Sequence, residues 1–271
     1  MFEVQRIESF DLPDLQPYRT MRLQMEHRQQ GIFVAEGDKL VRRLLESTLT
    51  VVSVLLPEQW LRELAPLLQT RPENVRVFVA EKALLETLTG FSMYQGLLAV
   101  GKVPARRSLE EVLDRNSRPW LLVAVDGLSS AENLGALVRN CAAFGAQALI
   151  VGETSSSPFL RRAVRSSMGT IFRLPVVEPP RLTETFANLR ARGVRCIAAH
   201  PHIEGRNLSG ASLAGDCCLV FGSEGNGISP GVLTACDEAA AIPMAPSVDS
   251  LNVGSAAAVF LYEANRQRER M

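Results

Sequence analysis

Beyond residue 119 the chain alternates short apolar runs with glycine-containing turns and amphipathic segments, and this alternation constrains the fold more than any other feature. Apolar runs bounded by turn residues are typical of strands buried on both faces, and their alternation with helices is typical of a parallel sheet. We therefore expect an α/β domain. Its expected strands are residues 120–125, 148–151, 173–176, 194–199, 217–221 and 239–242.

The preceding part of the chain contains both helical and strand-like segments. Helical spacing occurs at residues 40–46 and 59–68, and strand-like runs occur at residues 51–56, 75–79 and 97–100. Residues 102–119 are polar, hold prolines near both ends and contain one short helical piece, which indicates a domain boundary. A length of 271 residues fits two domains of unequal size. We expect domains at residues 1–104 and 119–271, joined by a linker at 105–118.

Composition narrows the class of protein. The 29 basic and 29 acidic residues balance, which argues against nonspecific nucleic-acid packaging but allows a local basic face. No apolar run reaches membrane-spanning length, and the first ten residues lack the features of a signal peptide. The five cysteines form no C-x-x-C pair, and the three histidines (His27, His200 and His202) form no ligand constellation. We expect a cytoplasmic protein with buried free thiols and no metal.

A first candidate constellation follows the strand that ends at Asp126. Asn133 is expected to cap a helix that Gly145 closes. Gly135 and Arg139 are four residues apart, so Arg139 lies over a position without a side chain, near the carboxyl end of a strand. The alternative is an exposed arginine in an ion pair.

A second constellation, residues 222–228 with the sequence GSEGNGI, follows the strand at 217–221. Its three glycines allow positive φ and close approach of the backbone to a ligand, and Ser229 and Pro230 fit the first positions of a helix. The order of glycines matches neither a Walker loop nor the dinucleotide fingerprint, so an ordinary glycine turn is the alternative.

A third constellation, residues 242–255, joins a strand to the final helix expected at 255–268. Polar residues alternate there with apolar ones, and the simplest alternative is capping of the last helix by Ser250 or Asn252. Turns at the ends of parallel strands converge on one site in this fold class. A fourth feature is the arginine group Arg161, Arg162, Arg165 and Arg173, which suits either a phosphate-binding face or a solvated helix.

The three constellations together resemble the signature motifs of the SpoU/TrmH family of RNA 2′-O-ribose methyltransferases, which belongs to the SPOUT superfamily. The matching patterns are N-x-G-x-x-x-R (Asn133 to Arg139), G-x-E-x-x-G-I (Gly222 to Ile228) and I-P-M-x(5)-S-L-N-V (Ile242 to Val253). Residues 157–176 and 31–44 are similar to further family segments. Gly254 departs from the family, whose members often have Ser or Ala there.

The resemblance implies a fold, a cofactor and roles for individual residues. It implies a C-terminal deep trefoil knot in the parallel sheet, a smaller N-terminal α/β domain resembling a ribosomal-protein RNA-binding fold, and a homodimer. It implies that S-adenosylmethionine binds at Gly222, Ile242, Met244 and Leu251. By similarity Arg139 activates the ribose hydroxyl, and Asn133, Glu224, Ser250 and Asn252 shape the site. We expect Arg161, Arg162 and Arg165 to contact RNA.

The expected function is transfer of a methyl group to a ribose 2′-hydroxyl of structured RNA, with ribosomal RNA as the first candidate. Transfer RNA is the alternative substrate, and a catalytically silent RNA-binding protein of the same fold is the alternative class. A nicotinamide-dependent oxidoreductase would need a G-x-G-x-x-G turn after its first strand, and residues 126–135 have none. An apolar face within residues 256–261 predicts a partner surface for a dimer.

Overall fold

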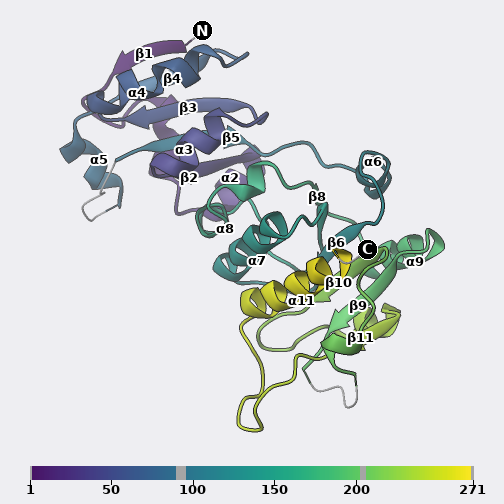
Figure 1. Ribbon diagram of the computed structural model, residues 1–271. Helices are drawn as coiled ribbons and strands as arrows, with labels where there is room; N and C mark the ends of the chain where they lie inside the picture. Colours follow the sequence, from purple (N-terminus) through teal and green to yellow (C-terminus); the bar gives the residue numbers. More distant parts are fainter. Residues whose placement is uncertain (1, 90–95, 202–205, 270–271) are drawn as a thin grey trace. The chain divides into compact units, whose positions relative to one another are not determined.

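In the computed structural model, residues 2–89, 96–201 and 206–269 are described. The chain forms two compact units (Figure 1). Unit 1 comprises Met1–Ala105 together with Phe159–Arg173, and unit 2 comprises Arg106–Pro158 together with Leu174–Met271. Neither unit is a single continuous stretch of sequence.

Unit 1 is built on a mixed five-stranded sheet with the order β1-β4-β3-β5-β2. Strands β1, β4 and β3 run parallel, whereas β5 is antiparallel to both β3 and β2. Its strands are β1 (Phe2–Arg6), β2 (Ile32–Glu36), β3 (Val51–Leu56), β4 (Val75–Val79) and β5 (Leu98–Lys102). Its helices are α1 (Gln16–Arg19), α2 (Gln24–Gln30), α3 (Asp38–Leu45), α4 (Glu58–Gln69), α5 (Lys82–Thr89) and α8 (Arg161–Ser166).

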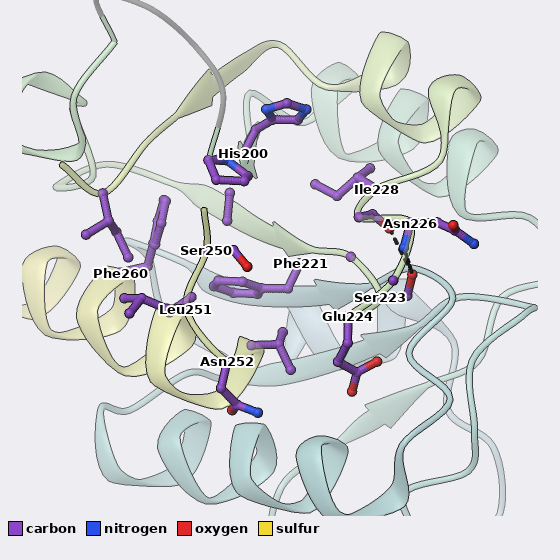
Figure 2. Close-up of a pocket in the computed structure, with 18 of the residues that line it drawn as sticks. His200, Phe221, Ser223, Glu224, Asn226, Ile228, Ser250, Leu251, Asn252 and Phe260 are labelled. Carbon is purple, nitrogen blue, oxygen red and sulfur yellow. Dashed lines mark hydrogen bonds between the residues drawn. The ribbon is translucent and has the colours of Figure 1, made fainter. Parts of the chain in front are cut away.

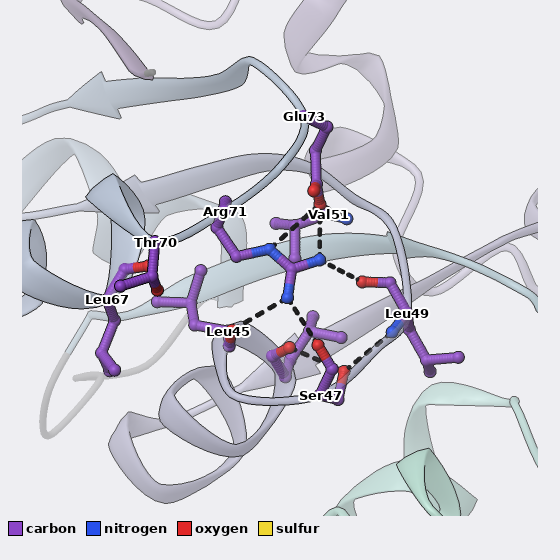
Figure 3. Close-up of polar contacts among 9 residues, drawn as sticks. Leu45, Ser47, Leu49, Val51, Leu67, Thr70, Arg71 and Glu73 are labelled. Atoms are coloured by element: carbon purple, nitrogen blue, oxygen red, sulfur yellow. Dashed lines mark hydrogen bonds and ion pairs between the residues drawn. The ribbon is translucent and has the colours of Figure 1, made fainter.

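A buried arginine fixes the connection between α3 and β3 (Figure 3). Arg71 is 7% exposed and donates hydrogen bonds to the carbonyls of Leu45, Ser47 and Leu49. Glu73 accepts from the same guanidinium at 2.7 Å and from the backbone N–H of Val51 at 2.6 Å. Carbonyls at and just beyond the end of a helix lack helical hydrogen-bond donors. Here the Arg71 guanidinium supplies the missing donors.

The segment Phe159–Arg173 joins unit 1 through an aromatic cluster. The ring of Phe33 on β2 lies 5.5 Å from that of Phe159 and 5.4 Å from that of Phe172, centroid to centroid. A Cβ on Gly101 would lie 2.5 Å from the Phe33 ring, so the packing of Phe33 requires glycine at that position of β5. Glu36 at the end of β2 pairs with Arg161 and lies 3.6 Å from Arg165.

Unit 2 is a six-stranded, all-parallel sheet with the order β11-β9-β10-β6-β7-β8, as the sequence predicts. Helices cover both faces: alternate strand residues pack on α6, α9 and α10, and the buried faces of α7 and α11 cover the other side (Figure 1). Its strands are β6 (Leu121–Val125), β7 (Ala148–Val151), β8 (Val176–Val177), β9 (Arg195–Ala199), β10 (Cys217–Phe221) and β11 (Glu238–Ala240). Its helices are α6 (Leu109–Asp114), α7 (Ala131–Ala143), α9 (Leu182–Ala191), α10 (Pro230–Ala235) and α11 (Val253–Arg268).

Two expected strands of unit 2 differ most from the observed ones. The strand predicted at 173–176 is the short β8, because Gly169, with φ +77°, begins a 3₁₀ turn (Thr170–Phe172) that occupies the preceding residues. The strand predicted at 239–242 is β11, which ends at Ala240. The apolar face of α11 that predicts a dimer contact is mostly used inside unit 2, where Phe260 packs edge-on against Phe221 at 5.6 Å and Leu261 is buried.

Candidate active site at the carboxyl edge of the parallel sheet

The three predicted constellations follow strands of one parallel sheet. The first begins α7 after β6, the second follows β10, and the third connects β11 to α11. Because parallel strands present their carboxyl ends at one edge, segments distant in sequence come together there. Hydrogen bonds between side chains and backbone groups hold these three segments together.

The segment after β10 is a tight turn that closes on itself. Ser223 and Gly227 exchange two backbone hydrogen bonds, of 2.9 and 3.0 Å, and the Ser223 hydroxyl accepts from the Asn226 N–H. A Cβ on Gly222 would lie 2.1 Å from the carbonyl carbon of Gly227. Glycine is therefore required at position 222 by the close approach of the turn's own backbone.

A chain of side-chain hydrogen bonds links all three constellations. Asn133 Nδ2 donates to Glu224 Oε1 at 2.5 Å, and Asn252 Nδ2 donates to Asn133 Oδ1 at 2.9 Å. Asn252 Oδ1 then accepts from the backbone N–H of Gly254 at 2.9 Å. Each amide donates to one neighbour and accepts from the other, so the network determines the orientation of both asparagines.

The helix ends differ in detail from the sequence expectation. Ser130 caps α7, and its hydroxyl accepts from the N–H of Asn133, which lies inside the first turn. The expected capping by Asn133 is therefore wrong, and its side chain is available for the network. Asn252 does cap α11, as one of the alternatives states. Gly145, with φ +71°, follows the end of α7 as expected.

The first turn of α11 docks along one stripe of α7. Asn133, Ala136 and Asn140 are spaced three and four residues apart, so they share a face of the helix. Asn140 Nδ2 donates to the Gly254 carbonyl at 2.6 Å. A Cβ on Gly254 would lie 3.2 Å from the Cβ of Ala136, so glycine at this departure from the family permits close packing.

Arg139 lies beside this stripe and is exposed, one turn beyond the buried Gly135. Within residues 2–89, 96–201 and 206–269, Arg139 forms no hydrogen bond or ion pair. The alternative of a surface ion pair is thus absent from the described part of the chain. An exposed guanidinium without an acidic partner can bind an anion supplied by a ligand.

A cavity of about 480 Å³ opens beside the network, between the ends of β9, β10 and β11 and the start of α11 (Figure 2). This volume falls in the range of small-molecule sites. The predicted cofactor residues Gly222, Ile242, Met244 and Leu251 all line it, and so do Glu224, Ser250 and Asn252. Asn133 and Arg139 are not among its lining residues.

The cavity has an apolar and a polar side. Figure 2 shows Leu251 and Phe260 on one side and the turn that carries Ser223, Glu224 and Asn226 on the other. Leu251 is 40% exposed, and a bound ligand would cover part of that surface.

Two residues of the site were missed by sequence reasoning. His200, at the end of β9, lines the cavity (Figure 2). Asp126 is 6% exposed, and its Oδ2 accepts from the Ser229 N–H at 2.7 Å, so it fixes the start of α10 where the Ser229 hydroxyl makes no capping bond. A carboxylate directly after a buried strand is the signal that could have found Asp126. His200 carried no such signal.

The arginines expected to bind RNA belong to unit 1. Arg161 is mostly buried by its ion pair with Glu36, whereas Arg162 and Arg165 are exposed. The cysteines are free thiols as expected; burial raises the pKa of Cys217 and Cys236, the latter to about 12. His27 is buried against Thr20, and burial lowers its pKa, while His202 lies outside the described residues.

The described residues offer neither a metal-binding cluster nor a membrane-spanning helix. No group of three or more His, Cys, Asp or Glu side chains within those residues is arranged to hold a metal ion. Among the helices of the described chain, none is both long and apolar enough to cross a bilayer.

Comparisons with known proteins agree on one family. Residues 120–262 match the model of the SpoU rRNA Methylase family. An uncharacterized tRNA/rRNA methyltransferase of Mycolicibacterium paratuberculosis is 35% identical over 72% of this chain, which spans 63% of the length of that relative. The 23S rRNA (guanosine-2′-O-)-methyltransferase RlmB of Ralstonia nicotianae is 34% identical over 72% of this chain and 78% of its own.

The similarity to a solved structure extends over nearly the whole chain. The SpoU methyltransferase AviRb of Streptomyces viridochromogenes, in complex with AdoMet, superposes with a TM-score of 0.81 at 27% identity. The match covers 94% of this chain and 97% of that one.

Proposed function

Because this chain belongs to the SpoU rRNA methylase family, we propose that it transfers a methyl group from S-adenosylmethionine to a ribose 2′-hydroxyl of structured RNA. The observation that carries this proposal is the hydrogen-bonded chain Glu224–Asn133–Asn252 beside the cavity, with Arg139 exposed next to it. The similarity to RlmB favours ribosomal RNA as the substrate. Transfer RNA is the second candidate.

The residues of the cavity fit S-adenosylmethionine. Its apolar side, with Leu251 and Phe260, would suit an adenine ring, and the Glu224 carboxylate that also lines the cavity would favour a positively charged sulfonium. We propose that Gly222, Ile242, Met244 and Leu251 hold the cofactor. When bound, the cofactor supplies an electrophilic methyl group on a good leaving group.

The chain's own contribution is positioning and charge. Arg139 stabilises the negative charge that develops on the ribose oxygen and binds an adjacent phosphate, because a guanidinium group is a cation and a poor proton acceptor. The hydrogen bonds of Asn133 and Asn252 fix the positions of Glu224 and the start of α11 relative to each other. Ser250 adds a further polar side chain to the lining of the cavity. Orientation of this kind accounts for much of the rate of a reaction with a good leaving group.

We further propose the organisation that the family implies. Residues 1–104 select the RNA and residues 119–271 carry the methyltransferase, with 105–118 as the linker. The C-terminal part forms a deep trefoil knot, the N-terminal domain has a ribosomal-protein RNA-binding fold, and two chains form a homodimer. Arg162 and Arg165 are the stronger RNA-binding candidates, since the ion pair of Arg161 with Glu36 keeps it mostly buried. An RNA substrate and reduced thiols suit a cytoplasmic location.

The experiment that tests the proposal combines binding and transfer. Isothermal titration should detect S-adenosylmethionine and not a nicotinamide dinucleotide. Labelled methyl should then enter ribosomal RNA, and nuclease digestion should recover it as a 2′-O-methylated nucleoside. Label found in transfer RNA alone would select the second substrate. Cofactor binding without transfer to any RNA would favour a catalytically silent RNA-binding protein.

A further inference from the structure

We propose that Lys39 and Arg43 of α3, together with Arg165 and Arg173 at the two ends of the turn that follows α8, form a surface that binds successive phosphates of the RNA backbone. We call these four residues the phosphate face. The inference rests on the proposed function, because it takes RNA as the substrate. It assigns Lys39 and Arg43, which lie outside the matched family domain, to substrate binding.

This face combines positive charges from two separate stretches of unit 1, which the contact of Arg43 with Met168 brings together. Several other arginines of unit 1 are neutralised by acidic partners: Arg6 with Glu58, Arg42 with Asp38 and Glu63, Arg71 with Glu73, and Arg76 with Asp14. Within the described chain, Lys39, Arg43 and Arg173 pair with no acid, and all three are exposed. Arg165 lies 3.6 Å from Glu36, whose carboxylate also binds Arg161, so positive charge remains in excess.

Helix α3 separates paired from unpaired cations. Lys39 and Arg43 are four residues apart and therefore neighbours on one face of the helix, whereas Arg42 takes part in the ion pairs of another face. Two like charges at this spacing destabilise a helix unless an anion lies between them. The arrangement is therefore favourable when a phosphate is bound.

A strained turn joins the two parts of the face. Arg43 donates to the carbonyl of Met168, which has φ +53°, a conformation that residues other than glycine rarely adopt. Backbone bonds from Met168 N to Arg165 O (3.0 Å) and from Gly169 N to Val164 O (3.3 Å) hold the turn in the manner of a Schellman motif. Strain retained in this way is typical of binding sites, and here it places Arg43 beside the turn between Arg165 and Arg173.

The chemistry of the face suits a polyanion. Guanidinium and ammonium groups bind phosphate oxygens through charge-assisted hydrogen bonds, and such contacts position a nucleic acid without reading its sequence. The four cations of the phosphate face, on α3, on α8 and after the turn, can bind several phosphates of one RNA strand. The face would hold the RNA, and residues of unit 2 would perform the chemistry.

The test uses full-length protein and a fluorescein-labelled RNA hairpin of arbitrary sequence. Lys39→Gln, Arg173→Gln and the double variant avoid Arg43, whose contact with Met168 supports the turn. Arg6→Gln is the matched control, because it removes one positive charge on β1, the edge strand opposite β2. Affinity for the hairpin is measured over a series of salt concentrations.

We expect each single variant to reduce the slope of log affinity against log salt by about 1, and the double variant by about 2. The KM for RNA should rise, with S-adenosylmethionine affinity unchanged and Arg6→Gln like wild type. Unchanged slopes for Lys39→Gln and Arg173→Gln, or an equal change in Arg6→Gln, would overturn the phosphate face. Wild-type protein that binds the hairpin but methylates no RNA overturns the proposed function, while the slopes still decide the face.

Discussion

Arg139 is exposed on α7 without an acidic partner in the described chain, beside the network that joins α7 to α11. If it stabilises the ribose oxygen, Arg139→Ala should slow single-turnover methyl transfer by about 10²–10³-fold. Arg139→Lys should recover only part of the rate, because it keeps the charge and loses the planar fork. A cofactor titration of the same variants should show little change. Near-normal turnover of Arg139→Ala contradicts the assignment, and lost cofactor binding would assign Arg139 to the cofactor cavity.

Asn133 is the one member of the network whose amide both donates to a carboxylate and accepts from another amide. Asn133→Asp replaces the donor by an oxygen that faces Glu224, so transfer at neutral pH should fall about 10–100-fold, the value of a hydrogen bond to a charged group. Protonation of one carboxyl at acidic pH restores a donor. Activity relative to wild type should therefore rise as the pH is lowered, and Asn133→Ala, as control, should show no such recovery.

At the scale of an element, the turn after β10 contains a matched pair of glycines. A Cβ on Gly222 would lie 2.1 Å from the backbone of Gly227, whereas a Cβ on Gly225 meets nothing within 4 Å. We expect Gly222→Ala to displace the turn, lower the melting temperature and weaken S-adenosylmethionine binding at least tenfold. Gly225→Ala should retain both properties. Equal behaviour of the two variants, measured by thermal unfolding and calorimetry, would show that the turn is not a rigid wall of the cavity.

The elements of unit 2 could be predicted because buried parallel strands leave a strong local signal. The runs at 148–151 and 217–221 match β7 and β10 to the residue. The predicted start of α7 lies three residues too late, because Ser130 and Asn133 are both good N-cap residues. The tertiary partner of Asn133, Glu224, decides between them. His200 and the phosphate face depend on which segments meet in space, and no local pattern carries that information.

At the scale of the whole molecule, buried thiols make the stability of the chain sensitive to alkaline pH. Burial raises the pKa of Cys141, Cys217 and Cys236. In the unfolded chain the pKa of a cysteine thiol is about 8.5. The free energy of unfolding is thus fully retained below that pH and falls as the pH rises toward the folded-state values, by up to about 1.4 kcal/mol per pH unit for each thiol.

Urea unfolding under reducing conditions at pH 7.5, 8.5 and 9.5 checks this expectation. The midpoint should change little over the first step and fall steeply over the second. In Cys141→Ala the free energy of unfolding should fall less steeply with pH, because the variant lacks one buried thiol. The slope should differ from that of wild type by up to about 1.4 kcal/mol per pH unit, the value for one proton. An equal decline in this variant would assign the pH dependence to other groups.

The best candidate surface for the proposed dimer lies on α11, where Val259 is 39% and Tyr262 is 59% exposed. The Tyr262 ring lies edge-on to the Phe144 ring, with 6.4 Å between their centroids. Tyrosine and phenylalanine in such a position are typical of protein interfaces. Light scattering at micromolar concentration should give twice the chain mass for wild type and a lower mass for Tyr262→Glu. A monomeric wild-type protein contradicts the dimer.

The inclusion of Phe159–Arg173 in unit 1 also limits how this chain can evolve. A gene fusion that exchanged residues 1–105 for the N-terminal region of a relative would remove Phe33, and Phe159 and Phe172 would face water or a mismatched surface. Recombination at the apparent domain boundary is therefore disfavoured, because the exchanged cassette lacks a part encoded more than fifty residues downstream. New RNA targets should arise by point substitution on unit 1, or by coordinated change of both stretches.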